Sequence, residues 1–292
     1  MKTATDKAAI LLEAMPYIRM FRDKPVVIKY GGSVMEDPVI SRNILADVAF
    51  LECVGIRPVI VHGGGKAISK KMLQSGLQSK FVEGRRVTDK DSVRVVEEVL
   101  NHEVNVEIVE NLIAHGARAA GLHGPGIIKA EKIEPVPGKD GRPIDLGFVG
   151  RVVAVDAAPI QACLKADIIP VITPLGRGAD GQVYNINADE SAAAVAMAIN
   201  AYKLVFISDV PGVMRDPQKP DSIISSLTRA EIDALIGDHT IHAGMLPKIQ
   251  GALSAIAAGV KKVHIIAGRT LHSLLLEIFT EKGIGTEIIN DK

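Results

Sequence analysis

Residues 25–32 of the chain are PVVIKYGG and residues 57–65 are RPVIVHGGG, and these two stretches decide the fold class. Each is a short, mostly apolar run that ends in a glycine turn and precedes a segment with helical spacing. For the first helix, Asp37 is a suitable N-cap, Pro38 suits the first helical position, and Gly55 can follow the last turn. A strand, a glycine turn and a helix, repeated, predict βαβ units and a parallel sheet.

The same alternation returns in the second half of the chain, after a turn-rich insertion at residues 127–155. Further strands are expected at 168–173, 203–208 and 262–267, and further helices at 188–200, 244–259 and 271–280. We therefore expect an α/β protein of two lobes that divide near residues 177–181, preceded by a helical arm at residues 1–23.

The composition excludes several classes of protein. The 292 residues include 34 Lys+Arg and 34 Asp+Glu, so the net charge is zero, which argues against a protein that coats nucleic acid or an anionic membrane. The longest uncharged runs have 12 residues, whereas a membrane-spanning helix needs about 18. The two cysteines, Cys53 and Cys163, form no CxxC motif, so we expect neither a disulfide framework nor a metal site. No signal peptide is evident, and the expected location is the cytoplasm.

Glycine turns after parallel strands bring backbone amides towards an anion, usually a phosphate. A Walker A loop is excluded because Ala67 follows Gly65-Lys66, and a dinucleotide loop is excluded because Ile68 stands where the last glycine belongs. If the first two strands are adjacent, both turns face one crevice, and their amides and the Lys29 ammonium can bind a phosphoryl group. His62, which opens the second turn, is expected to shape it. The alternative, that the glycines only permit tight turns, stays open.

Six motifs in one order connect these turns to the rest of the chain. They are IKYGGS at 28–33, VHGGG at 61–65, GRRVTD at 84–89, YNINAD at 184–189, ISDVPGV at 207–213 and GMLPK at 244–248. Together they resemble the amino acid kinase family over nearly the whole chain. The resemblance implies a three-layer αβα fold with an open, mainly parallel central sheet, as in carbamate kinase. It also implies an acceptor lobe at residues 24–177 and a nucleotide lobe at residues 178–292.

Within that family the motifs are most similar to those of members that act on N-acetyl-L-glutamate. These use ATP, bound with Mg²⁺, to phosphorylate the side-chain carboxylate, in the second step of arginine biosynthesis. The resemblance implies no tightly bound cofactor. Two alternatives stay open: a carbamate, aspartate, glutamate 5- or uridylate kinase of the same fold, and a non-catalytic arginine sensor.

The resemblance also implies the site residues. Lys29 and Lys248 are the catalytic cations, one from each lobe, and Asp189 holds both in place. The alternative, that Asp189 is the N-cap of its helix, stays open. No base is expected, because a glutamate side chain titrates near pH 4.3 and is already ionised at pH 7. The implied acceptor-binding residues are Gly64, Gly65, Arg86 and Asn185. The implied nucleotide-binding residues are Gly31, Gly32, Ser208, Asp209, Gly212 and Met245. Lys66 and Ala243 depart from the family pattern.

Two further segments resemble the arginine-inhibited members of the family: the arm at residues 1–23 and the stretch LLEIFTEKGIGTEI at 275–288. The resemblance implies a hexamer, a trimer of dimers interlaced by the arm, and a site for L-arginine. Its residues would be Tyr17, His264, Glu277 and Gly283. The open alternatives are an arm packed on its own domain, a core histidine at 264 and a solvated carboxylate at 277. Some members also bind a nitrogen-signalling regulatory protein, which makes such a protein a possible partner here.

Overall fold

An eight-stranded sheet forms the centre of the computed structural model, which describes residues 4–82, 84–138, 141–216, 218–241, 245–280 and 283–290. The strand order is β14-β16-β15-β13-β1-β2-β10-β5, and every neighbouring pair is parallel except β15 and β16. The strands are β1 (Pro25–Tyr30), β2 (Arg57–His62), β5 (Ala119–Leu122), β10 (Ile169–Ile172), β13 (Lys203–Ser208), β14 (Ser226–Leu227), β15 (Lys262–Ala267) and β16 (Thr286–Ile288).

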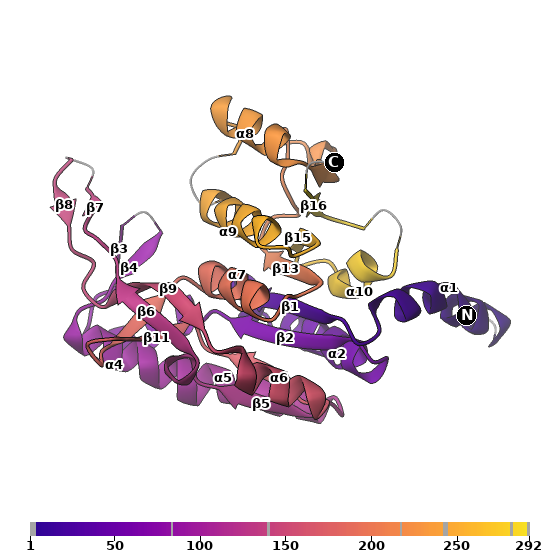
Figure 1. Cartoon of the computed structure of the whole chain (residues 1–292), viewed down its shortest axis with the longest axis horizontal. Helices are drawn as coiled ribbons and strands as arrows, with labels where there is room; N and C mark the ends of the chain where they lie inside the picture. The colour runs from indigo at the N-terminus through magenta and orange to yellow at the C-terminus, as the bar shows by residue number, and fades with distance from the viewer. Residues whose placement is uncertain are drawn as a thin grey trace.

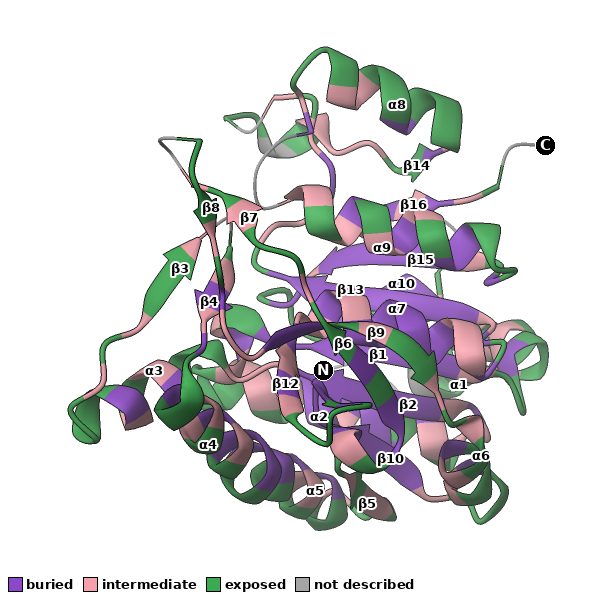
Figure 2. Ribbon diagram, turned by 60° about the vertical axis from the view of Figure 1, so that its left-hand side comes forward, coloured by how far each residue is buried: buried purple, intermediate pink, exposed green. Residues whose placement is uncertain are grey.

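Helices cover both faces of this sheet (Figure 1). One face packs against α2 (Pro38–Cys53), α3 (Gly65–Gln74), α4 (Lys90–Glu98), α5 (Asn105–Ala114) and α10 (Ser273–Ile278). The other packs against α6 (Ala157–Lys165), α7 (Ala188–Ala198) and α9 (Leu246–Ala257), with α8 (Arg229–Gly237) at the edge. Within β1, Val26 and Ile28 contact the first core and Val27 the second, because successive strand side chains alternate between faces. The expected αβα layering with a mainly parallel sheet is confirmed, and Figure 2 shows the buried strands between half-exposed helices.

A small four-stranded barrel stands beside the sheet. It consists of β6 (Ile128–Lys132), β9 (Val149–Val155), β11 (Leu175–Gly178) and β12 (Val183–Ile186). Two hairpins project nearby, β3 (Lys80–Val82) with β4 (Arg85–Val87), and β7 (Val136–Pro137) with β8 (Pro143–Ile144). The lobe boundary expected after residue 177 falls at the end of β11, where the β11–β12 hairpin holds residues from both sides in one barrel. The division into lobes therefore stays a prediction.

The N-terminal helix α1 (Ala4–Phe21) projects away from the rest of the chain, at the right of Figure 1. Its last residue, Phe21, is buried, but Leu11, Leu12 and Met20 are 66%, 65% and 55% exposed. The described chain therefore leaves an apolar helix surface uncovered. Among the residues described, no helix combines the length and apolarity needed to cross a bilayer.

Candidate active site

The two glycine turns touch each other. β1 and β2 are parallel neighbours in which Tyr30 pairs with His62, and the Gly63 amide donates to the Tyr30 carbonyl at 2.7 Å. A Cβ on Gly31 would lie 3.3 Å from the Gly63 Cα, so a side chain there would press tightly against the second turn. Gly32 has a φ of +79°, a left-handed conformation that favours glycine. The expectation that both turns face one crevice is confirmed.

Lys29, Lys248 and Asp189 form one buried cluster at this crevice. The Lys29 Nζ lies 3.0 Å from Asp189 Oδ1, and the Lys248 Nζ lies 2.6 Å from Asp189 Oδ2. Lys29 is on β1, Lys248 is in the first turn of α9, and Asp189 is in the first turn of α7. Burial raises the pKa of Asp189, but the two ammonium groups outweigh it and hold the pKa below its usual range. The carboxylate is therefore ionised and bridges two cations.

Asp189 is not the N-cap of α7. Asn187 takes that position, and its side-chain oxygen accepts from the amides of Asp189 and Glu190 at 2.8 and 3.3 Å. The alternative that Asp189 serves only as a helix cap is therefore wrong. Because Asn187 satisfies the helix end, the Asp189 carboxylate is left for the two lysines.

Two cavities meet at this cluster, and Lys29 and Gly32 line both. The first has a volume of about 590 Å³, and Gly63, Gly64 and Gly65 form part of its wall. The second, of about 410 Å³, is also lined by Lys248 and by the predicted nucleotide residues Gly31, Ser208, Asp209, Gly212 and Met245. The structure thus brings together all six residues predicted to bind nucleotide.

Asp209 also lines both cavities. Its Oδ1 accepts from the Ser33 hydroxyl at 2.6 Å and from the Ser33 amide at 3.2 Å. Ser33 lies in a 3₁₀ helix, η1 (Gly32–Met35), that follows β1, and Asp209 follows β13. An exposed carboxylate therefore accepts from the same turn that is expected to bind phosphate.

Arg86 lines a third, small cavity of about 150 Å³, together with Gly64, Gly65 and Asn185. Its guanidinium donates to the Gly65 carbonyl at 2.7 Å and the Ser69 hydroxyl at 2.8 Å. The ring of Phe81 lies 4.6 Å below it. Burial lowers the pKa of Arg86, and no carboxylate of the described residues lies within ion-pair distance of it. Its positive charge is therefore held in place by neutral groups and is not balanced by a neighbouring carboxylate.

Lys66, one of the two residues that depart from the family pattern, forms an ion pair. The Lys66 Nζ lies 2.5 Å from Glu36 Oε2 and joins the start of α3 to the end of η1. Ala243 and the neighbouring Gly244 of the GMLPK motif lie outside the described residues. Across the described ranges, no group of three or more His, Cys, Asp or Glu side chains could hold a metal ion.

Residues 24–267 of the chain match the amino acid kinase family. The chain belongs to this family. Among its relatives, the acetylglutamate kinase of Geobacter sp. is 47% identical over 99% of this chain and 99% of its own. The acetylglutamate kinase of Symbiobacterium thermophilum is 45% identical over 98% of each chain.

Solved structures show the same kinase-family architecture. The N-acetylglutamate synthase of Neisseria gonorrhoeae, complexed with coenzyme A and N-acetylglutamate, has a TM-score of 0.83 at 27% identity; the alignment covers 98% of this chain and 64% of the synthase. The same synthase with coenzyme A and L-arginine has a TM-score of 0.79 at 28% identity, over 97% and 65% of the two chains. A carbamate kinase of Giardia lamblia, with a TM-score of 0.65 at 18% identity, shares the fold.

Two of the predicted effector residues of this kinase-family chain, His264 on β15 and Glu277 on α10, face each other. His264 Nδ1 pairs with Glu277 Oε1, and Glu277 Oε2 accepts from the amides of Ile284 and Gly285 at 2.7 and 3.2 Å. A Cβ on Gly283 would lie 2.7 Å from Glu277 Oε2. Glu277 is only 5% exposed, so the alternative of a solvated carboxylate is wrong.

Tyr17 reaches this region from α1. Its ring packs edge-on against Phe279 at a centroid distance of 6.4 Å. The structure thus brings His264, Glu277 and Gly283 together, and Tyr17 contacts Phe279, which lies two residues after Glu277 in the chain. Burial lowers the pKa of His264, so the ring is neutral at pH 7.

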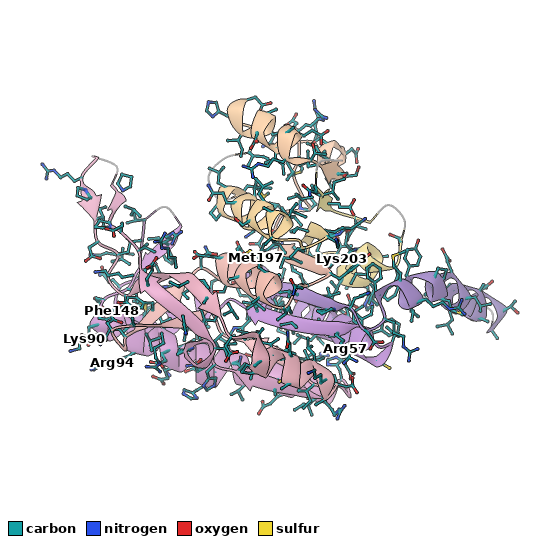
Figure 3. All side chains as sticks on the ribbon, in the orientation of Figure 1. Arg57, Lys90, Arg94, Phe148, Met197 and Lys203 are labelled. Carbon is teal, nitrogen blue, oxygen red and sulfur yellow. The ribbon has the colours of Figure 1, made fainter. Side chains whose placement is uncertain are left out.

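Lys203, which is labelled in Figure 3, is a further buried cation that was not predicted from the sequence. It is 4% exposed, its ammonium lies 4.9 Å from the Phe21 ring centroid, and burial lowers its pKa to about 8. Glu277 is one of the acidic groups that act on it electrostatically. The only sequence signal was a charged residue at the start of an otherwise apolar strand.

Proposed function

We propose that the chain catalyses transfer of the γ-phosphoryl group of ATP to the side-chain carboxylate of N-acetyl-L-glutamate. The products are N-acetyl-L-glutamyl 5-phosphate and ADP. The observation that carries the proposal is the pair of lysines held on one buried carboxylate where the two large cavities meet. Relatives named acetylglutamate kinase align over almost the whole chain and supply the identity of the acceptor.

The acceptor binds on the side of Arg86 and Asn185. The Arg86 guanidinium pairs with the α-carboxylate, because a planar fork of donors matches two carboxylate oxygens. Asn185 contributes an amide from β12, and its nitrogen already lies 3.4 Å from the Thr88 hydroxyl. This arrangement leaves the side-chain carboxylate near Gly64 and Gly65, whose amides begin α3.

The nucleotide binds on the other side, in the cavity lined by Ser208, Asp209, Gly212 and Met245, and brings Mg²⁺ with it as part of the substrate. We assign most of this side to residues 178–292 and most of the acceptor side to residues 24–177; Gly31, Gly32 and Asn185 each line the cavity of the other side. In-line phosphoryl transfer spreads negative charge over the attacking, equatorial and leaving oxygens. Lys29 and Lys248 stabilise that charge, one from each side, and Asp189 keeps the two ammonium groups in register.

An assay of ADP release tests the proposal. N-acetyl-L-glutamate, carbamate, L-aspartate, L-glutamate and UMP are each offered with ATP and Mg²⁺. We expect turnover only with N-acetyl-L-glutamate. ADP release with another acceptor alone would reassign the substrate, and L-arginine binding without any turnover would indicate a sensor.

A regulatory role for L-arginine is supported by the buried Glu277–His264 pair beside Gly283 and by Tyr17 on the arm that packs over the same helix. One structural neighbour was solved with L-arginine. We propose that the guanidinium of L-arginine pairs with Glu277, and that the exposed apolar side of α1 interlaces dimers into a hexamer. Binding of a nitrogen-signalling regulatory protein stays a prediction.

Deletion of residues 1–23 tests the arm. We expect the shortened chain to sediment as a dimer and to lose inhibition by L-arginine while it keeps its turnover. A shortened enzyme that is still hexameric and still inhibited would contradict both roles.

A further inference from the structure

His62 is a buried group that the mechanism above does not use. It ends β2 directly before the glycine turn and has no exposed surface. It lines none of the three cavities at the active site. Burial lowers its pKa to about 4, so the imidazole is neutral at pH 7, with one nitrogen that donates and one that accepts.

Asn105 determines which nitrogen of His62 carries the proton. Its Nδ2 lies 2.9 Å from the Val171 carbonyl and 3.2 Å from His62 Nε2. A carbonyl can only accept, so the atom that faces Val171 is the amide nitrogen, and its second hydrogen points to His62. His62 Nε2 therefore accepts, and the proton is on Nδ1.

The protonated Nδ1 in turn orients a peptide of the glycine turn. It lies 2.7 Å from the Gly63 carbonyl and donates to it. The peptide between Gly63 and Gly64 is trans, so its N–H points opposite to its C=O. With the carbonyl held on the side of His62, the Gly64 N–H points away from it. Gly64 lines both the first and the third cavity.

The wall behind the turn keeps this orientation. It is a π-helix, η2 (Val99–Val104), between α4 and α5, and π-helical segments frequently occur at functional sites. A Cβ on Gly64 would lie 2.6 Å from Leu100 Cδ2 and 3.7 Å from Val104 Cγ2. The segment that packs against Gly64 thus leads directly into Asn105, which is 2% exposed.

We propose that His62 and Asn105 are positioning residues for phosphoryl transfer, which hold the Gly63–Gly64 peptide so that the Gly64 N–H is aimed at the reacting anionic oxygens. The chain of hydrogen bonds runs from the Val171 carbonyl through Asn105 and His62 to Gly63. This inference rests on the proposed function, because it takes the glycine turn as the place where the phosphoryl group is transferred.

The test compares His62→Asn with His62→Leu. The two side chains have nearly the same shape, but the asparagine amide can donate from the δ position and leucine cannot. We expect kcat of H62L to fall about 100-fold, as for small misplacements of reacting groups, and H62N to stay within about tenfold of the wild type. The KM values should change less than kcat, because the aimed N–H matters most in the transition state. Equal kcat values for H62N and H62L would overturn the proposal.

A second measurement does not depend on activity. ¹⁵N-histidine NMR of the full-length protein at pH 7 should show His62 protonated on Nδ1 and unprotonated on Nε2, with the signals assigned by their loss in H62N. The Nε2–H tautomer or an imidazolium would refute the positioning chain whatever the substrate is. If ADP is released only with another acceptor, the proposed function fails, and the two variants are compared on that acceptor. Absence of ADP release with every acceptor would refute both.

Discussion

Replacement of Asp189 by Asn removes the charge that holds Lys29 and Lys248, the two lysines that we propose to be catalytic. The carboxylate contacts their ammonium groups at 3.0 and 2.6 Å, and at an effective dielectric constant of about 20 each contact carries roughly 6 kcal/mol of Coulomb attraction before desolvation. Desolvation offsets much of this attraction, and disruption of such a buried pair typically costs about 3–5 kcal/mol. In Asp189→Asn the two ammonium groups also repel each other, so neither stays where the transferred phosphoryl group needs it.

We therefore expect kcat for ADP formation to fall about 100- to 1,000-fold, equivalent to roughly 3–4 kcal/mol of transition-state stabilisation. Lys248→Met should cost a similar factor, and the double variant should cost less than the product of the two, because the residues act as a unit. The matched control is Asp145→Asn, which removes an exposed carboxylate 2.8 Å from Lys132 and should leave kcat unchanged. A kcat for Asp189→Asn within threefold of the wild type would refute the anchoring role.

Three further changes test other parts of the site. Arg86→Lys should raise the KM for N-acetyl-L-glutamate about 10- to 100-fold with little change in kcat, because a single ammonium cannot replace a bidentate fork; a higher KM for ATP alone would contradict this. Gly64→Ala should lower the free energy of unfolding by about 1–3 kcal/mol, measured by denaturant titration, because its Cβ would lie 2.6 Å from Leu100 Cδ2; unchanged stability would mean that Leu100 moves away freely. His62 should make the protein less stable in acid, because burial lowers its pKa from 6.5 to about 4. Between these pH values the unfolded state binds more protons than the folded state. The free energy of unfolding should therefore fall by about 3 kcal/mol in all as the pH drops through that range. Between pH 7 and 4.5, denaturant titrations should show a smaller loss of unfolding free energy for His62→Asn than for the wild type. An equal loss in the two proteins would refute the buried neutral histidine.

Local sequence was sufficient to predict several of the main strands and helices and to point to the candidate site. β-Branched runs, helix caps and glycine turns act over a few residues, so β1, β2 and the helices after them could be predicted from spacing. The six motifs together predicted the family, and with it Lys29, Lys248, Arg86 and the turn glycines. Since the carboxyl ends of parallel strands lie at one edge of a sheet, the convergence of the two turns followed once β1 and β2 were adjacent.

The partners of the polar groups were decided only by the tertiary structure. Asn187 and Asp189 are both suited to cap α7, and only the positions of Lys29 and Lys248 show that Asp189 serves the lysines. From the sequence, Glu277 could be an exposed residue at a helix end. In the structure the segment that contains Gly283 covers it.

The same holds for His62, whose protonation and donor atom depend on Asn105 and Val171, 43 and 109 residues further along the chain. Burial and hydrogen bonding set the energy of a charged or polar group. Both are properties of neighbours brought together by folding, which no local pattern of residues contains.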